Sequence, residues 1–187
     1  YPPVDTHFYT PDFRVPREDF YLVVSALVPY KKVDHAVKAA KKAGKKLIVI
    51  GEGPDRKRLE KMAAADTVFM GWQPDSILRD HYRRAKALLF PGEEDFGIVP
   101  VEAQACGLPV IAYGVGGATE TVLSNETGVL YNEQKESALA EAILAFEKLA
   151  LDAEFIRKNA VRFSRDRFVM EIKAFIQTKT SSFGPLR

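Results

Sequence analysis

From residue 20 onward, short runs of apolar residues alternate with stretches in which apolar positions recur every three or four residues. The first pattern predicts buried strands and the second predicts amphipathic helices. The predicted strands are residues 20–26, 46–51, 67–71, 85–90, 109–113 and 128–131, and the predicted helices lie near 32–43, 54–64, 74–84, 98–106, 117–123 and 135–150. Such alternation is typical of βαβ units, so we expect an α/β fold with a parallel sheet of about six strands and helices on both faces.

The two ends of the chain depart from this alternation. Residues 1–19 contain several prolines and follow neither period, so we expect an extended lead-in from a missing N-terminal domain. Residues 20–187 are expected to form one domain. Its last part, residues 152–179, predicts a terminal helical pair that either packs on the sheet or reaches toward a missing neighbour. One apolar stripe of this pair is predicted to contain Phe155, Ile156, Ala160 and Phe163.

Composition narrows the class of protein. The 187 residues are 47% hydrophobic, which is enough for the core of one domain. Lys and Arg number 27 against 25 Asp and Glu, so there is no electrostatic case for nucleic acid as a partner. Cys106 is the only cysteine, which excludes an internal disulfide or a cysteine zinc site and fits a reducing compartment. No apolar run reaches the length of a membrane span.

Two common nucleotide-binding motifs are missing. The turn after the first strand, "SALVPYKK", has no glycine, so the G-x-G-x-x-G fingerprint of dinucleotide-binding enzymes fails there. No G-x-x-x-x-G-K-[ST] phosphate loop occurs either. The consecutive acids Glu93, Glu94 and Asp95 have the oxygen ligands that Mg²⁺ prefers, but such loop acids are usually solvated. The histidines lack metal-ligand spacing, and we expect no metal site.

The segment "EDFGIVPVE" sets two carboxylates, Glu94 and Glu102, at the ends of a turn that leads into a predicted helix. A helix start attracts phosphate, whereas carboxylates repel it. The conflict is resolved by a ligand that carries phosphate and neutral diols, because carboxylates accept hydrogen bonds from paired hydroxyls. A nucleotide sugar is such a ligand. Taken singly, each glutamate is more simply a solvated acid, but their joint spacing around Gly97 after a buried strand favours a site.

Several segments, in order, resemble one protein family. They are "SALVPYKKVDHAVKAA", "VIGEGPDRKRLEKMA", "MGWQPDSILRDHYRRAKALLFPGEEDFGIVPVEAQACGLPVIAYGVGGATETV" and "ETGVLY". Together they resemble the C-terminal, donor-binding half of retaining GT-B glycosyltransferases of group 1, many of which are mannosyltransferases. The resemblance covers roughly residues 1–175 and implies a Rossmann-like domain, one half of a GT-B fold, that binds a nucleotide sugar.

The resemblance also implies roles for individual residues. Glu94 matches the glutamate beside the transferred hexose, Glu102 the glutamate that takes the ribose hydroxyls, and Lys31 a catalytic cation on the diphosphate. The remaining matches are the phosphate and sugar donors and the turn beneath them (Gly51, Phe96, Gly97, Ile98 and Val99) and the base-binding wall (Gly71, Trp72 and Leu78). For Trp72, ordinary packing is an equally good interpretation.

One position departs from the family pattern. The family commonly places an arginine on the diphosphate where this chain has Ala26. Because negative charge builds on the leaving phosphate, the loss of that cation is expected to slow transfer severely. Two explanations compete: a degenerate or engineered chain, or a neighbouring cation, Lys32 or Arg56, that takes over the role.

The resemblance implies an enzyme that transfers mannose or glucose from a GDP or UDP donor without a metal or cofactor. A glycan or lipid-linked acceptor is then expected on the missing N-terminal domain, in the cytoplasm or at the membrane surface. Two alternatives stay open. The first is a non-catalytic nucleotide-sugar-binding module, for which Ala26 is the main sequence evidence. The second is a synthase or epimerase of the same two-domain architecture.

Overall fold

The computed structural model describes residues 1–181, so the last six residues of the predicted domain lie outside the described part. Its sheet has six parallel strands in the order β3-β2-β1-β4-β5-β6. The strands are β1 (Tyr21–Val24), β2 (Leu47–Ile50), β3 (Val68–Gly71), β4 (Ala87–Phe90), β5 (Val110–Tyr113) and β6 (Gly128–Tyr131). Every predicted strand is confirmed, each within two residues of its expected bounds, because buried parallel strands are near-continuous apolar runs.

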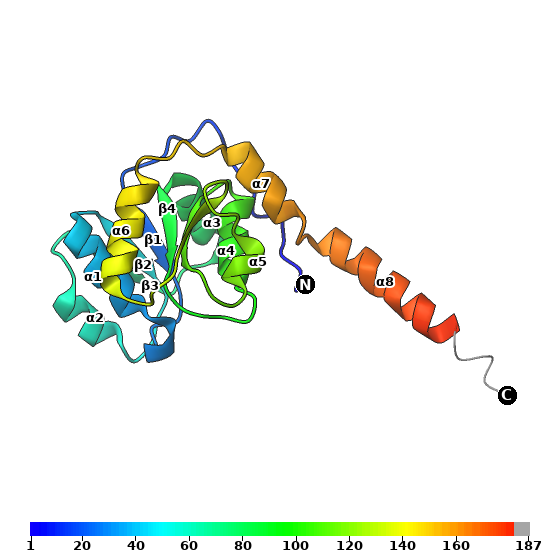
Figure 1. Cartoon of the computed structure of the whole chain (residues 1–187), viewed down its shortest axis with the longest axis horizontal. Coiled ribbons are helices and arrows are strands. Elements are labelled where there is room, and N and C mark those ends of the chain that lie inside the picture. The colour runs from blue at the N-terminus through cyan, green and yellow to red at the C-terminus, as the bar shows by residue number, and fades with distance from the viewer. Residues whose placement is uncertain (182–187) are drawn as a thin grey trace.

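Helices cover both faces of the sheet, as predicted (Figure 1). One face carries α1 (Val33–Ala43), α2 (Arg56–Met62) and α6 (Glu136–Phe146), and the other carries α3 (Asp75–Arg84), α4 (Ile98–Ala105), α5 (Ala118–Thr121) and α7 (Ala153–Val161). Neighbouring strand residues point to opposite faces, so Tyr21 and Val23 lie in the core under α1 and α6, whereas Leu22 lies in the core under α3 and α4. Both cores are therefore closed by helices.

The strand order places a topological switch point between β1 and β4. The chain runs from β1 through β2 to β3 on one side, and then returns to pair β4 with β1 from the other side. Loops that leave the carboxyl ends of β1 and β4 therefore diverge, which opens a crevice where ligands of doubly wound sheets bind. The loop after β1 contains the short 3₁₀ helix η1 (Pro29–Lys31), and the loop after β4 leads to α4.

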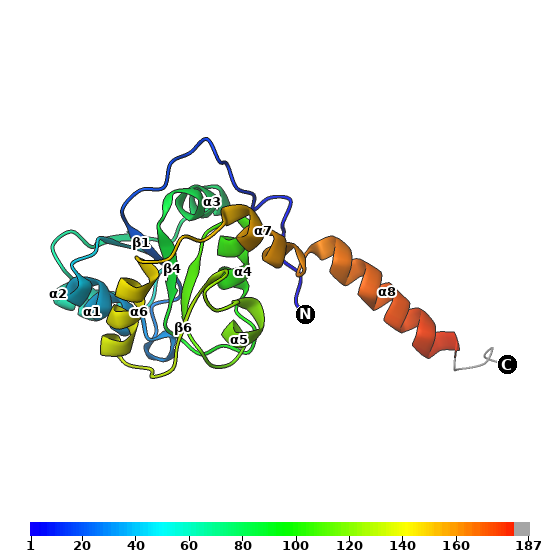
Figure 2. The same ribbon diagram turned by 45° about the horizontal axis from the view of Figure 1, so that its top comes forward.

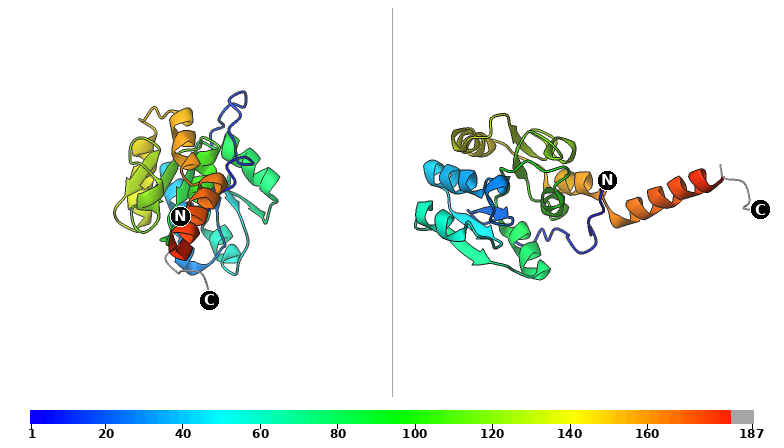
Figure 3. Two further views of the ribbon diagram at one scale, coloured as in Figure 1. Left: turned by 90° about the vertical axis from the view of Figure 1, so that its right-hand side faces the viewer. Right: turned by 90° about the horizontal axis from the view of Figure 1, so that it is seen from below.

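The terminal helices take different paths. α7 packs on α4, with Ile156, Ala160 and Phe163 buried, but Phe155 is 39% exposed, so its predicted place in the apolar stripe is wrong. α8 (Arg165–Ser181) projects away from the body (Figures 1 and 3). Of the helices that the structure describes, none combines the length and apolar composition that a membrane crossing requires. The exposed apolar residues of α8 are Phe168, Val169, Met170, Ile172, Phe175 and Ile176.

The lead-in, residues 1–19, follows the body of the domain along the side of α3 and α7 (Figure 2). Val4 forms an isolated bridge with Ser164 and is buried, as is Tyr9. The Arg157 guanidinium on α7 donates to the backbone oxygens of Tyr9, at 2.7 Å, and Thr6, at 2.6 Å. The extended segment therefore belongs to the packing of the domain.

Candidate functional site

Two adjoining clefts occupy the crevice at the switch point. The first cleft, of about 610 Å³, lies between the loops after β1 and β4, and the second, of about 410 Å³, lies over the ends of β1, β2 and β3. They gather most of the predicted site residues: Lys31, Glu94, Phe96, Gly97, Ile98 and Val99 line the first cleft, and Gly51, Trp72, Leu78 and Val99 line the second. The residues common to both are Val24, Ser25, Ala26 and Val99.

An ion pair spans the first cleft. The Lys31 ammonium, at the end of η1, lies 2.6 Å from Glu94 Oε1, and the two side chains are 18% and 28% exposed. Because both groups are partly withdrawn from water, their attraction is screened less than that of a surface pair. Lys31 is the one cationic side chain among the described residues that line the two clefts.

The start of α4 presents unpaired amides to the first cleft. Gly97, the residue before the helix, has φ +82°, and a Cβ there would lie 3.2 Å from the Phe90 ring, so a larger residue would be strained. No side chain caps the helix, and the amides of residues 96–99 donate to no acceptor in the part of the chain that the structure describes. Pro100 follows in the first turn, where its missing N–H costs nothing. This helix start can therefore hold an anion.

The loop that carries Glu94 is supported by the start of α5 and by the residues after α7. The Gly117 amide donates to the Glu94 backbone oxygen at 2.8 Å, and the Phe96 ring packs on Phe163 at 5.4 Å between centroids. Gly117 belongs to the sequence segment "GVGGAT", which does not have the full spacing of the dinucleotide fingerprint. Gly117 supports the loop that carries Glu94 through a contact that no local sequence pattern reveals.

The second cleft is walled by the turn after β2 and the residues after β3. Gly51 has φ +132°, and a Cβ there would lie 1.9 Å from the Ser25 backbone oxygen, so only glycine allows these two loops to touch. Its amide donates to the Gly71 oxygen at 2.8 Å. Gly71 itself is buried and lines neither cleft, whereas Trp72, at 70% exposure, lines the second one. A wall of Trp72 and Leu78 can accept a flat ring.

Glu102 lies one helical turn beyond the start of α4 and is half-buried. It lines neither cleft, and its Oε2 accepts a hydrogen bond from the Tyr82 hydroxyl at 3.1 Å. Burial raises the pKa of the Glu102 carboxyl from an ordinary 4.5 to about 7, the Tyr82 hydrogen bond lowers it, and Asp75 adds to the rise.

The position of Ala26 is open, and no neighbouring cation fills it. Ala26 is exposed and lines both clefts. Arg56 instead donates to the Phe69 oxygen at 3.1 Å and pairs with Glu60, and Lys32 lines neither cleft. Among the described residues, no group of three acidic, histidine or cysteine side chains is placed to hold a metal ion, the acids around Glu94 included.

The fold and the crevice together define a doubly wound α/β domain, with unpaired amides at a helix start beside acidic side chains at its switch point. The family model described as glycosyl transferases group 1 matches residues 11–163. The chain belongs to this family.

Curated relatives agree with this assignment. A D-inositol 3-phosphate glycosyltransferase of Acidothermus cellulolyticus is 35% identical over 79% of this chain and 38% of its own length. A GDP-mannose-dependent alpha-(1-6)-phosphatidylinositol monomannoside mannosyltransferase of Mycobacterium tuberculosis is 32% identical over 76% of this chain and 44% of its own length. The chain therefore spans less than half the length of these two relatives.

Solved structures share the fold. Anabaena HepE, in complex with UDP and glucose, aligns with a TM-score of 0.79 at 22% identity over 97% of this chain and 56% of its own. The C-terminal domain of the group 1 protein LpcC from Francisella tularensis aligns with a TM-score of 0.64 at 23% identity over 84% of this chain and 92% of its own. The predicted Rossmann-like half of a GT-B fold is confirmed.

Proposed function

We propose that this chain is the donor-binding domain of a retaining glycosyltransferase that takes a hexose from a GDP or UDP sugar. The observation that carries the proposal is the Lys31–Glu94 pair beside the unpaired amides of residues 96–99 at the switch point. A diphosphate brings the anion that the amides and the ammonium attract, and a sugar brings hydroxyls for the carboxylate.

In this proposal the donor is divided between the two clefts. The diphosphate lies in the first cleft against Lys31 and the start of α4, with the hexose beside Glu94. The base lies in the second cleft, against Trp72 and Leu78, and the ribose lies between the two clefts at Val99, three residues before Glu102 on the same face of α4. Gly51 supports the floor beneath it, because its turn contacts the loop after β1.

Transfer breaks the bond between the hexose and the diphosphate, so negative charge grows on the leaving phosphate. Fixed amide dipoles and the Lys31 ammonium interact more strongly with that charge in the transition state than in the ground state. Glu94 holds Lys31 in the first cleft, where the diphosphate shares the ammonium with this carboxylate or displaces it. We propose that these groups act without a metal ion.

GDP-mannose is the donor that we favour, with mannosyl transfer as the reaction. The support is the mycobacterial relative, which is named as a GDP-mannose-dependent mannosyltransferase. HepE was solved with UDP and glucose, which keeps a UDP sugar as the competing donor. A glycan or lipid-linked acceptor, bound by a preceding domain in the cytoplasm or at a membrane surface, completes the proposal.

A second candidate function is favoured by one observation. Ala26 leaves Lys31 as the only cation on the described cleft walls, and a single cation stabilises a leaving diphosphate less than two do. A module that binds a nucleotide sugar without efficient transfer would tolerate this arrangement. Donor binding is common to both candidates, whereas turnover separates them.

Calorimetric titration of the full chain with GDP-mannose, UDP-glucose and UDP-GlcNAc tests donor binding. We expect one of the three to bind with the same affinity in EDTA and in Mg²⁺. Lys31→Ala should weaken that binding about tenfold, since it removes a charge-assisted contact. Lys42→Ala, at an exposed lysine on α1 outside both clefts, is the matched control. Failure of all three donors to bind would overturn the proposal.

A further inference from the structure

Tyr82 links the two helices that flank the ribose position. It is fully buried on α3, and its hydroxyl donates to Glu102 Oε2 on α4 at 3.1 Å. A carboxylate has two oxygens and about four acceptor sites. With Oε2 held by Tyr82, the rotation of the carboxylate is restricted and Oε1 is left for a ligand.

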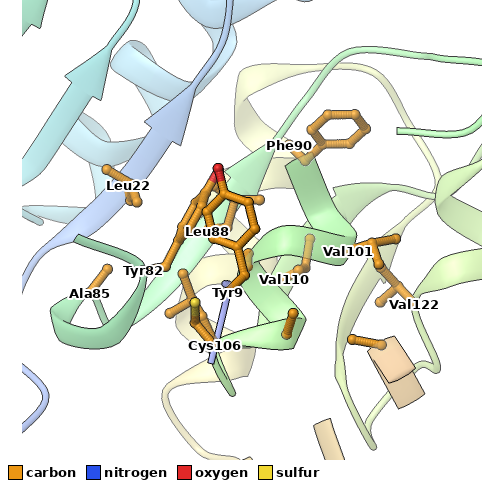
Figure 4. Close-up of a cluster of buried hydrophobic side chains, with 14 of the residues drawn as sticks. Tyr9, Leu22, Tyr82, Ala85, Leu88, Phe90, Val101, Cys106, Val110 and Val122 are labelled. Atoms are coloured by element: carbon orange, nitrogen blue, oxygen red, sulfur yellow. The ribbon is translucent and has the colours of Figure 1, made fainter. Parts of the chain in front are cut away.

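The Tyr82 ring is itself held from the lead-in. Tyr9, 5% exposed, packs edge-on against it with ring centroids 5.8 Å apart, and Figure 4 shows the two rings side by side with their hydroxyls at the same end. The Tyr9 backbone oxygen accepts from Arg157, which also donates to the oxygen of Ala105, the last residue of α4, at 2.9 Å. The lead-in is thereby tied to the helix that carries Glu102.

A second guanidinium ties the ends of the two helices together. Arg17 donates to the backbone oxygens of Tyr82, at 2.7 Å, and Gly107, at 2.7 Å, the latter just after α4. Burial lowers the pKa of this guanidinium, which nevertheless satisfies three buried carbonyls, the third being that of Ala85. The separation of Tyr82 and Glu102 is therefore fixed by contacts at the base of both helices.

We propose that Tyr82 is the positioning residue of the ribose site: it orients Glu102, so that the free carboxylate oxygen accepts the ribose hydroxyls. The inference rests on the proposed function and specifies how its ribose site is built. A buried tyrosine that only needs a hydrogen-bond partner would use the same contact for stability alone. The two roles predict different results, because only the positioning role makes the effect of Tyr82 on nucleotide affinity depend on the ribose hydroxyls.

The test compares GDP or UDP, whichever the parent binds, with its 2′,3′-dideoxy analogue by calorimetry. Tyr82→Phe removes only the hydroxyl and should weaken the ribonucleotide about tenfold at pH 8, while the dideoxy analogue changes less than twofold. Tyr131→Phe is the matched control, because that hydroxyl is buried without a hydrogen-bond partner among the described residues. It should change neither affinity.

A pH series gives a measurement that a general loss of stability would not change. The ratio of ribonucleotide to dideoxy affinity should fall as pH drops through about 7, where Glu102 takes up a proton. In Tyr82→Phe the midpoint of this fall should move to higher pH, since a hydrogen bond that favours the carboxylate is lost. Because both ligands carry the same diphosphate, comparing their affinities at each pH cancels the effect of diphosphate protonation. Asp75 also faces Glu102 and is unchanged in every variant.

Each outcome bears on a separate claim. Equal losses for both ligands in Tyr82→Phe, or none, would overturn the positioning role while leaving the donor site intact. A parent that binds both ligands equally would exclude Glu102 from the ribose, and a parent that binds neither would refute the proposed function itself. If Tyr82→Phe does not fold, Glu102→Gln keeps the inference testable: it must abolish the pH-dependent ribose preference, and a preference that survives contradicts the inference.

Discussion

The Lys31 ammonium and the Glu94 carboxylate, 2.6 Å apart, join the loop after β1 to the loop after β4. The contact lies at the point where the order of the strands reverses, and both residues line the first cleft. The carboxylate neutralises the ammonium. A diphosphate must therefore share Lys31 with Glu94, or displace it.

This relationship predicts the effect of Glu94→Gln. Free GDP or UDP should bind at least as tightly as before, because the competing charge on Lys31 is removed. A nucleotide sugar should lose its advantage over the free nucleotide, since a charged hydrogen bond to the hexose is worth about 1.5–3 kcal/mol. Calorimetry with GDP and GDP-mannose, or the UDP pair, measures both. Glu133→Gln, which removes an exposed partner of Lys135, is the control. A tenfold loss for the free nucleotide would mean that Glu94 acts mainly by holding Lys31.

Ala26→Arg is expected to tighten the binding of GDP or UDP several-fold. Ala26 is exposed and lines both clefts, so a long side chain has room to reach the diphosphate, and a guanidinium can bind two phosphate oxygens at once. Ala26→Gln, long but neutral, separates the effect of charge from that of size. If arginine and glutamine behave alike, another cation already serves the diphosphate in solution.

The raised pKa of Glu102 predicts that the stability of the fold depends on pH. Its pKa is about 7 in the folded chain and near 4.5 as an ordinary glutamate, so between these values the folded state binds a proton that the unfolded state does not. The free energy of unfolding should therefore fall as pH rises from about 4.5 to 7, on the order of 2–3 kcal/mol from this group.

Urea unfolding of the parent and Glu102→Gln between pH 5 and pH 8 measures this contribution. The variant should lose that part of the pH dependence and be the more stable protein at pH 8. Glu126→Gln, at an exposed glutamate, should follow the parent. Parallel profiles for the parent and Glu102→Gln would show that the carboxyl ionises freely.

Trp72 supplies an optical signal for the base. It is the only tryptophan of the chain and lines the second cleft at 70% exposure, so a bound base that packs on it should change its emission. Fluorescence titration with GDP and UDP checks this, and pyrophosphate, which has no base, should leave the emission unchanged. Unaltered emission at a nucleotide concentration that calorimetry shows to be saturating would place the base elsewhere.

The elements of the fold were predictable because their signals are local. Each strand is an apolar run, and each helix repeats its apolar positions within a few residues. The error at Phe155 has the same origin: on α7 it is adjacent to Ile156 in sequence, but the buried face is defined by α4, which the pattern does not contain. Likewise, the burial of Tyr9 in the lead-in leaves no periodic trace.

The candidate site was predictable only in part. Lys31 and Glu94 follow strands that a doubly wound topology brings together, so their meeting could be expected from the sequence. The bond from Tyr82 to Glu102 and the contacts of Arg17 and Arg157 join residues far apart in the chain. Such side-chain contacts depend on how helices pack, and no motif spacing records them. The hydrogen bond from the Gly117 amide to the Glu94 backbone oxygen is another such long-range contact.

The pairing of β1 with β4 also has a consequence for the order of folding. β2 and β3 lie close behind β1 in sequence, but the β1–β4 pair, which brings Tyr21 beside Ala87, closes a much longer loop at a greater cost in chain entropy. Until that step is complete the crevice does not exist, and Lys31 and Glu94 lie on two segments that have not yet come together. A nucleotide that needs both is therefore expected to slow the unfolding of the finished domain without accelerating its folding.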